Sequence, residues 1–251
     1  MRVAALYDVH GNLPALEAVL DDVARAAVDL VVLGGDAVPG PIPAETLDRL
    51  TALDFPARFI HGNGDREVLA QMTGSETNWY RNALEQWREP VRWSAEQLGA
   101  GHRATMAGWP ATCAVEIDAV GEVLFCHATP RNDTDTFTRL TPEERLLPIF
   151  SEVEADLVVV GHTHMQFDRT IGGTRVVNAG SVGMPFGEPG AYWLLVGPHV
   201  ELRFTAYDLE RAAERIMATG YPQAEEFATH SVLRPPAEDE SLEMFSRVEL
   251  A

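Results

Sequence analysis

Five short blocks of metal-ligand residue types are spaced along the chain, and each follows an apolar segment. The blocks are Asp8-Val9-His10, Gly35-Asp36, Gly62-Asn63, His127 and Gly161-His162-Thr163-His164. Carboxylate, amide and imidazole groups suit divalent Mn, Fe, Zn or Ni, and the absence of thiolates from the blocks disfavours a structural zinc site. Three oxygen ligands and four imidazoles would be enough for two ions, which could clamp a phosphate oxygen and activate a water.

The spacing within the blocks predicts how the ligands share a face. Asp8 and His10 are two residues apart, as are His162 and His164, so on a regular strand each pair would point to one side. Asp36 follows two glycines, which let the backbone approach a crowded site, and it is placed to bridge two ions. Each block alone has an ordinary reading, such as a helix cap or a surface histidine. Their joint occurrence favours a two-metal centre.

The apolar segments before the blocks are expected to be buried strands. They are residues 3–7, 30–33, 57–60, 122–126 and 157–160. Helical spacing follows two of them, near residues 14–23 and 44–53, and strands that alternate with helices indicate βαβ units and a largely parallel sheet. The carboxyl ends of parallel strands meet at one edge, where rigid side chains converge.

The segment 74–110 interrupts this alternation and predicts a helical insertion near the mouth of the site. Tyr80, Leu84, Trp87 and Val91 fall at helical spacing, and Pro90 should kink or split the helix. Its aromatic side chains could stack on a ring of the substrate, or they could form only a small core of their own.

Beyond the insertion, residues 112–118 and 122–126 form a predicted hairpin, and further hairpins are expected near 172–173 and 197–198. Residues 141–144 resemble a capping box that opens a helix. Residues 1–206 are expected to form the main domain. The tail, residues 207–251, begins as a helix and is packed on or extends from that domain; after Tyr221 it becomes acidic, which is typical of loose packing or of a partner contact.

Composition restricts the classes of function. The net charge of −19 repels polyanions and argues against general nucleic-acid binding, although it permits a small phosphorylated substrate at bound metal ions. All 19 basic residues are arginine, which excludes lysine Schiff-base chemistry and a P-loop lysine. No run is long enough to cross a membrane, and with two cysteines, Cys113 and Cys126, and no signal-peptide pattern a cytoplasmic location is expected. An oligomer is compatible with these features.

In their order and spacing, the five blocks resemble the signature of the calcineurin-like metallophosphoesterase superfamily. Residues 7–12 and 178–183 are similar to its small prokaryotic phosphodiesterase branch, and the resemblance covers residues 1–206. It implies an α/β fold, a four-layer αββα sandwich of two mixed β-sheets flanked by helices, with a dinuclear site at one sheet edge.

Residue by residue, the resemblance implies two sets of metal ligands that share Asp36. One set is Asp8, His10, Asp36 and His164, and the other is Asp36, Asn63, His127 and His162. Asn12 would touch the substrate phosphate, so Asp36, Asn63, His127 and Asn12 are the catalytic candidates. The implied cofactors are two divalent transition-metal ions, with Mn favoured, and the implied activity is phosphodiesterase cleavage by in-line attack of a metal-bridging hydroxide.

The chain departs from this family at Gly64, where many members carry a histidine that assists the leaving group. Asp65, which would partner it, is present. Loss of a general acid costs about 10²–10⁴-fold for a poor leaving group, so aryl phosphodiesters should be cleaved faster than alkyl phosphomonoesters. His61 is a candidate substitute acid or a supporting histidine, and Asp65 could instead cap a helix beginning at Arg66.

Other charged residues near the blocks are weaker candidates. Arg66 and Arg131 follow ligand blocks and are candidates for gripping phosphate, although each also suits a surface ion pair. His102 could reach over the site from the insertion, or could be a surface histidine.

Alternative functions remain open at this point. One is a phosphomonoesterase that acts on phosphoprotein, nucleotide or dinucleoside polyphosphate, and another is a non-catalytic scaffold of the same fold. A dinucleotide-binding module is disfavoured, because Glu67 breaks the glycine fingerprint that begins at Gly62.

Overall fold

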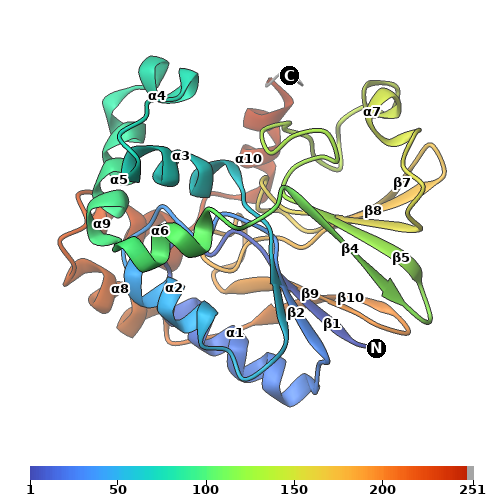
Figure 1. Cartoon of the computed structure of the whole chain (residues 1–251), viewed down its shortest axis with the longest axis horizontal. Coiled ribbons are helices and arrows are strands. Elements are labelled where there is room, and N and C mark those ends of the chain that lie inside the picture. The colour runs from blue at the N-terminus through green and yellow to red at the C-terminus, as the bar shows by residue number, and fades with distance from the viewer. Residues whose placement is uncertain (248–251) are drawn as a thin grey trace.

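The computed structural model describes residues 1–247, and its strands form two five-stranded sheets that face each other (Figure 1). The first sheet has the order β10-β9-β1-β2-β3, with bounds Val200–Thr205, Ala191–Val196, Val3–Leu6, Leu30–Leu33 and Ala57–Phe59. The second has the order β4-β5-β6-β8-β7, with bounds Thr112–Ile117, Gly121–Cys126, Leu157–Val160, Thr174–Asn178 and Phe167–Ile171.

The first sheet is parallel on one side and antiparallel on the other, and the second sheet is parallel at its centre and antiparallel at both edges. Strands β1, β2 and β3 run parallel, as do β5, β6 and β8, whereas β9, β10, β4 and β7 pair in antiparallel fashion. The predicted strands and hairpins are confirmed. The two mixed sheets also account for the apolar character of the central strands, because both faces of each are covered.

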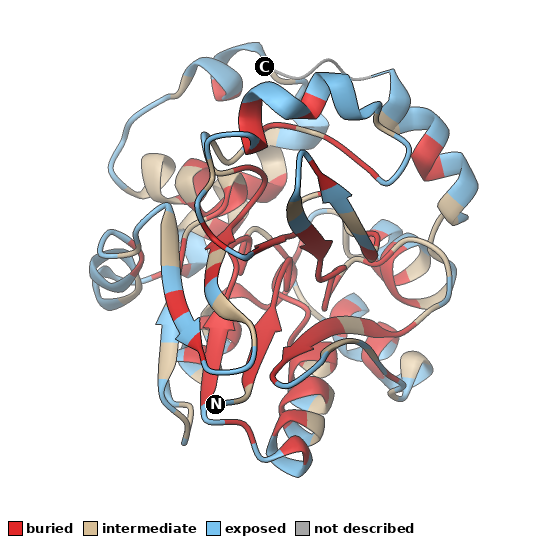
Figure 2. Cartoon of the chain, turned by 90° about the vertical axis from the view of Figure 1, so that its right-hand side faces the viewer, coloured by how far each residue is buried: buried red, intermediate tan, exposed pale blue. Residues whose placement is uncertain are grey.

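Helices complete the four layers. On the outer face of the first sheet, α1 (Leu13–Ala26), α2 (Pro43–Thr51) and α8 (Leu209–Met217) bury apolar stripes in one core with β1 and β2. On the outer face of the second sheet, α7 (Glu143–Phe150) buries Leu146 and Phe150 against β6 and β8. A third core fills the space between the sheets, and Figure 2 shows buried strands at the centre of the molecule beside partly exposed ones. The predicted αββα sandwich is confirmed.

The insertion forms α4 (Asn78–Asn82), α5 (Glu85–Gln97) and α6 (Ala100–Met106), after α3 (Asn63–Met72). Of the kink or split expected at Pro90, the split does not occur, because α5 continues through this residue. Proline leaves the carbonyl four residues earlier, that of Gln86, without its helical donor. The side chain of Gln223 supplies the donor instead, with its Nε2 2.6 Å from the Gln86 oxygen. The tail therefore stabilises the insertion.

The predicted capping box at residues 141–144 was also wrong. Helix α7 begins at Glu143, and no side chain caps it. The hydroxyl of Thr141 accepts the N–H of Thr138 instead, at 2.9 Å, and Glu143 accepts the N–H of Gly172 in the β7–β8 turn. Both side chains hold the preceding loop and the hairpin rather than the helix.

The described part of the tail packs against the first domain. It continues after α8 as α9 (Ala224–Phe227), a π-helical segment η1 (Ala228–Leu233) and α10 (Glu238–Ser246). Phe227 and Val232 are buried in the core that contains α1, so loose packing after Tyr221 was a wrong expectation. Within residues 1–247, no helix combines the length and hydropathy needed to cross a bilayer.

Candidate metal centre

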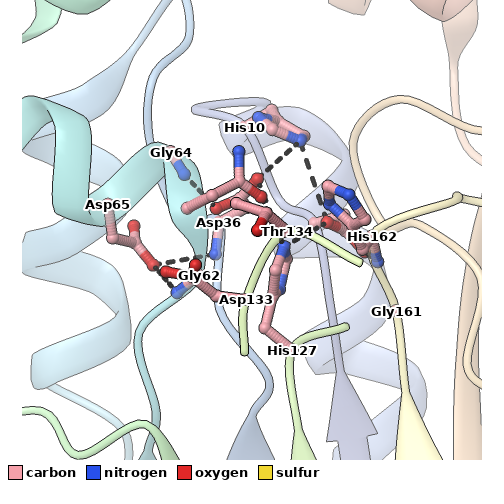
Figure 3. A network of polar contacts seen from close by, with 12 residues as sticks. His10, Asp36, Gly62, Gly64, Asp65, His127, Asp133, Thr134, Gly161 and His162 are labelled. Atoms are coloured by element: carbon pink, nitrogen blue, oxygen red, sulfur yellow. Dashed lines mark hydrogen bonds and ion pairs between the residues drawn. The ribbon is translucent and has the colours of Figure 1, made fainter. Parts of the chain in front are cut away.

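The structure brings the seven ligand candidates together at the carboxyl ends of five parallel strands. Asp8 and His10 follow β1, Asp36 follows β2, and Asn63 follows β3 of the first sheet, while His127 follows β5 and the His162–His164 pair follows β6 of the second. The site therefore spans the edge where the two sheets meet, as Figure 3 shows for several of these side chains.

The backbone at these positions is left-handed. The positive φ angles are 54° at Asp8, 47° at His10, 52° at Asp36, 64° at His162 and 59° at His164. Among the described residues other than glycine, only Ala27 shares this conformation. Each such residue costs about 1–3 kcal/mol, and this strain persists where surrounding structure and function require it.

The same φ angles correct the expectation that strand alternation aligns the pairs. Asp8 and His10 lie beyond the end of β1, and His162 and His164 lie beyond the end of β6. Left-handed turns rather than a regular pleat aim their side chains. As a result, His162 and His164 point toward different groups of ligand atoms.

The first group of ligand atoms lies around Asp8. The Nε2 of His164 lies 3.4 Å and the Nε2 of His10 lies 3.9 Å from Asp8 Oδ1, and the two Nε2 atoms are 3.3 Å apart. All three side chains are largely buried. Three ligand atoms at these separations can share one cation.

The second group lies around Asn63 and His127. The Nε2 of His127 lies 3.1 Å from Asn63 Oδ1, and the Nδ1 of His162 lies 3.0 Å from the same side-chain position. Asp36 stands between the groups, because its Oδ2 is 3.5 Å from His127 Nε2 and 3.7 Å from His10 Nε2. This position suits a carboxylate that bridges two ions.

Backbone carbonyls orient three of the imidazoles. The Nδ1 atoms of His10, His127 and His164 lie 3.2, 2.9 and 2.7 Å from the carbonyl oxygens of Pro39, Gly34 and Met184. A carbonyl only accepts, so each Nδ1 carries the proton and donates it. In the neutral form of each ring the lone pair is then on Nε2, which faces the centre, and this is the arrangement that metal-ligating histidines adopt.

A test of whether these residues fit cations comes from two groups that lack ordinary partners. Asp8 Oδ1 is buried without a hydrogen-bond donor. The oxygen of Asn63 faces only acceptor atoms, and its amide would donate to both imidazoles if it were turned over. A cation in each group would satisfy these oxygens in the orientation observed, and a buried carboxylate without compensation is costly. The donor set therefore fits two divalent ions.

Electrostatics in the centre follow from the two buried carboxylates. Burial raises the pKa of Asp36, but the imidazole of His127 outweighs it and leaves that pKa well below the usual range. Burial lowers the pKa of His127, whereas the carboxylates of Asp36 and Asp8 raise it to about 10. Burial and then the charge of His127 lower the pKa of His162 to about 4. The carboxylates thus attract positive charge into the centre.

Asp65 is a third carboxylate, but it supports backbone rather than reaching the ligand atoms. It lies in the first turn of α3, which begins at Asn63, so the expected helix start at Arg66 was wrong. Its oxygens accept the N–H groups of Asp36, Gly62 and Val38 at 2.8, 3.0 and 3.2 Å, and Figure 3 shows the first two. Burial and then Asp36 raise the pKa of Asp65 to about 7.

Gly64 lies against the same loops. Its N–H donates to Asp36 Oδ1 at 2.7 Å, which leaves Oδ2 directed at the imidazoles. A Cβ at this position would lie 2.7 Å from the carbonyl oxygen of Val38 and 2.8 Å from Pro39 Cδ. The packing at this position leaves no room for a Cβ, so a histidine at residue 64 would require the neighbouring backbone to move.

The candidates for substrate contact are not brought to the ligand atoms. Asn12 is fully buried, because its Oδ1 caps α1 at Ala15 and its Nδ2 donates to the Gly183 carbonyl. Both polar atoms of the Asn12 amide are thus engaged within the protein, and its contact with the substrate phosphate stays a prediction. His102 lies 2.9 Å from Asp48 on α2, so it is a surface histidine rather than one that covers the site.

Arg66, Arg131 and His61 line a separate cavity of about 210 Å³ beside His127. Arg66 binds Asp133 with two nitrogens and also Glu67, and Arg131 binds Asp135 in the same two-nitrogen fashion. His61 lies 3.6 Å from Asp133, which is the first cause of its raised pKa. Both arginines thus form the ion pairs that were considered as an alternative to phosphate binding. The sequence did not indicate that Asp133 would be the partner of Arg66.

A larger cavity of about 590 Å³ opens over the ligand atoms. His10, Asp36, Asn63, His162 and His164 line it, together with parts of the insertion and of the tail. Phe186 stacks on His164, with ring centres 5.6 Å apart. Neither Phe186 nor the tail residues were predicted to lie here, because no local motif marks a wall that forms only through tertiary packing.

Comparisons with known proteins agree with this geometry. The model of the calcineurin-like phosphoesterase superfamily domain matches residues 1–196. The uncharacterized protein MJ0912 of Methanocaldococcus jannaschii is 25% identical over 242 residues, which cover 88% of this chain and 94% of that relative.

Two solved structures are similar over nearly their whole lengths. A metallophosphoesterase from Sphaerobacter thermophilus superposes with a TM-score of 0.71 at 25% identity, covering 91% of this chain and 97% of that one. The hypothetical protein PH1004 from Pyrococcus horikoshii OT3 superposes with a TM-score of 0.78 at 22% identity, covering 94% and 99%.

Proposed function

Because the chain belongs to the calcineurin-like phosphoesterase superfamily, a family of dinuclear metal-dependent enzymes, we propose that it is a phosphodiesterase that hydrolyses a small phosphate ester. One observation supports this proposal most directly. Two buried carboxylates and four imidazoles meet where the sheets join, and the Nε2 atoms of His10, His127 and His164 lie 3.4–3.9 Å from Asp8 Oδ1 or Asp36 Oδ2. Such a donor set binds Mn, Fe, Ni or Zn, and we favour Mn.

We assign the seven ligand candidates to two ions, although Asp8 Oδ1 also lies close to Asp36 and His127. Asp8, His10 and His164 would hold one ion, Asn63, His127 and His162 the other, and Asp36 would bridge them. Two ions in these positions would lower the pKa of a water and neutralise charge on the phosphate.

The residues of the chain contribute by fixing this donor set before substrate arrives. The N–H of Gly64 and the carbonyl-bound imidazoles hold the ligand atoms in place, so little reorganisation is needed during in-line displacement at phosphorus. Gly64 offers no proton to a leaving group. A diester with a good leaving group is therefore the substrate class that this centre serves best.

The distinguishing experiment compares two aryl esters with the same leaving group. Protein reconstituted with Mn²⁺ should hydrolyse bis(4-nitrophenyl) phosphate with a kcat/KM at least about tenfold above that for 4-nitrophenyl phosphate, and both activities should vanish in Asp36→Ala. The purified protein should hold about two ions per chain. A higher kcat/KM on the monoester would favour the phosphomonoesterase, and activity retained in Asp36→Ala would place hydrolysis elsewhere. A chain without bound ions or hydrolysis would be a scaffold.

A further inference from the structure

We infer that the large cavity selects a phosphodiester with a single phosphate group and one planar aromatic substituent, and rejects substrates that carry a second phosphate. This inference rests on the proposed function, because it places the reacting phosphate at the seven ligand candidates. It assigns the cavity walls, and in particular the tail, a role in specificity.

The first support is the shape and position of the cavity. Its floor contains ligand candidates of both groups, so a phosphate there has the rest of the molecule directed into about 590 Å³ of space. Ligand cavities of about 300–1,000 Å³ enclose a small organic molecule. The substituent on phosphorus would therefore lie against the walls of this cavity, which is partly open to solvent.

The second support is the aromatic lining. Trp79 and Trp87 line the cavity from the insertion and are 45% and 57% exposed, while Phe186 lines it above His164. Exposed tryptophans are unusual on a surface with no ligand, and their faces stack well on planar rings. A ring on the substrate would cover them.

The third support is charge. None of the described residues that line this cavity is an arginine, and the chain has no lysine. Three glutamates line it instead, Glu67, Glu226 and Glu240. The first is paired with Arg66, whereas the other two are exposed residues of the tail. A second phosphate would meet these carboxylates without an arginine or lysine partner, and His230 is the one histidine of the tail at this wall, so the walls favour a neutral substituent.

The tail contributes to this selectivity because hydrogen bonds and ring contacts hold it against the other walls of the cavity. Gln223 bonds to Gln86 of the insertion, and Tyr221 packs edge-on against Trp93 at 5.2 Å. The N–H of Gly187 donates to Pro236 at 2.9 Å, and Phe245 contacts Phe186. In Figure 1, α9 lies beside α5 and α10 lies above the strand ends. Glu226 and Glu240 are thus held at the cavity.

The test of the aromatic preference uses binding. In the Mn²⁺ protein, calorimetry should show methyl phenylphosphonate binding at least about tenfold more tightly than methyl methylphosphonate, which has the same charge and no ring. Trp87→Ala should remove most of this difference. Leu84→Ala is the matched control, since Leu84 is exposed nearby but does not line the cavity. Equal affinities of the two phosphonates would overturn the aromatic preference.

The test of the charge preference is a gain of function. Wild-type protein should cleave diadenosine tetraphosphate with a kcat/KM at least about 100-fold below that for bis(4-nitrophenyl) phosphate. Glu226→Arg should raise the first value at least about tenfold, whereas Glu225→Arg, with the same change of charge on a neighbour that does not line the cavity, should not.

The outcomes separate the two proposals. Comparable cleavage of both substrates by the wild type, or equal effects of the two arginine variants, would overturn the selection by charge and leave the phosphoesterase intact. Failure to hydrolyse any ester would overturn the proposed function, and the phosphonate affinities would still decide the aromatic preference.

Discussion

The backbone N–H of His162 donates to Oδ2 of Asp8 at 2.9 Å, and this bond joins the two sheets at the candidate centre. Asp8 lies just beyond the carboxyl end of β1 in the first sheet, and His162 lies just beyond the carboxyl end of β6 in the second. With Oδ2 engaged in this way, Oδ1 is left for the imidazoles of His10 and His164. The Asp8 carboxylate thus links the two sheets through one oxygen and offers the other oxygen as a ligand atom.

Asp8→Asn should separate these two tasks. The amide oxygen can still accept the His162 N–H, so the fold should persist, but an NH₂ group would then face the imidazoles. We expect at least about tenfold weaker Mn²⁺ binding, measured by equilibrium dialysis and elemental analysis. Asp21→Asn on the exposed side of α1 is the control. Unchanged affinity in Asp8→Asn would remove Asp8 from the ligand set.

Ion binding should stabilise the whole molecule, because the ligand candidates come from both sheets. At an Mn²⁺ concentration about 100 times its dissociation constant, the gain of about 2.7 kcal/mol should raise the Tm by about 5–10 °C. Chelation should reverse the shift, and Asp36→Ala should show a much smaller one. A Tm that is insensitive to Mn²⁺ in the wild type would contradict a two-ion centre.

Gly64→His should not create a better enzyme. Its Cβ would collide with Val38 and Pro39 and press on Asp36, so we expect a loss of about 1–3 kcal/mol in the free energy of unfolding and lower kcat/KM. Gly101→Ala in α6 is the control, because nothing lies within 4 Å of its Cβ. Increased monoesterase activity in a stable Gly64→His protein would show that the loops can yield.

The bond between Gln223 and Gln86 should depend on Pro90. Gln223→Ala should cost about 0.5–1 kcal/mol of stability, measured by denaturant unfolding, because it leaves the Gln86 carbonyl without a donor. In a Pro90→Ala background the helix supplies its own N–H, so the same substitution should cost less. Equal costs in both backgrounds would mean that the bond does not compensate for the proline.

The sequence was sufficient to predict the positions that gather at the centre, because an apolar strand followed by a ligand places that ligand at a known edge of a parallel sheet. It did not reveal how Asp8 and His10 turn inward, since positive φ angles at residues other than glycine leave no mark in composition. The cap that Asn12 makes on α1 was not predicted, because a helix cap and a polar contact to a ligand favour the same residue type.

The tail could not be predicted for a different reason. Acidic residues and prolines are frequent in this segment, so its sequence did not indicate that Phe227 and Val232 are buried. Both pack into the core around α1, which is distant in the sequence. The local sequence pattern of such a segment is determined mainly by its exposed side chains. Its packing depends on a surface that residues far away in the chain form. For the same reason the ion pair between Arg66 and Asp133, which are 67 residues apart, was not predicted.

The order of these elements along the polypeptide has a consequence for how such a protein can change. All seven ligand candidates precede residue 165, and the wall formed by residues 221–244 is the last part of the cavity to leave the ribosome. The ligand candidates and the acidic wall of the tail therefore lie in separate stretches of the sequence, whereas Trp79 and Trp87 lie between two ligand blocks. Recombination within the stretch that encodes residues 221–244 could therefore change the charge of this wall while all seven ligand candidates are kept.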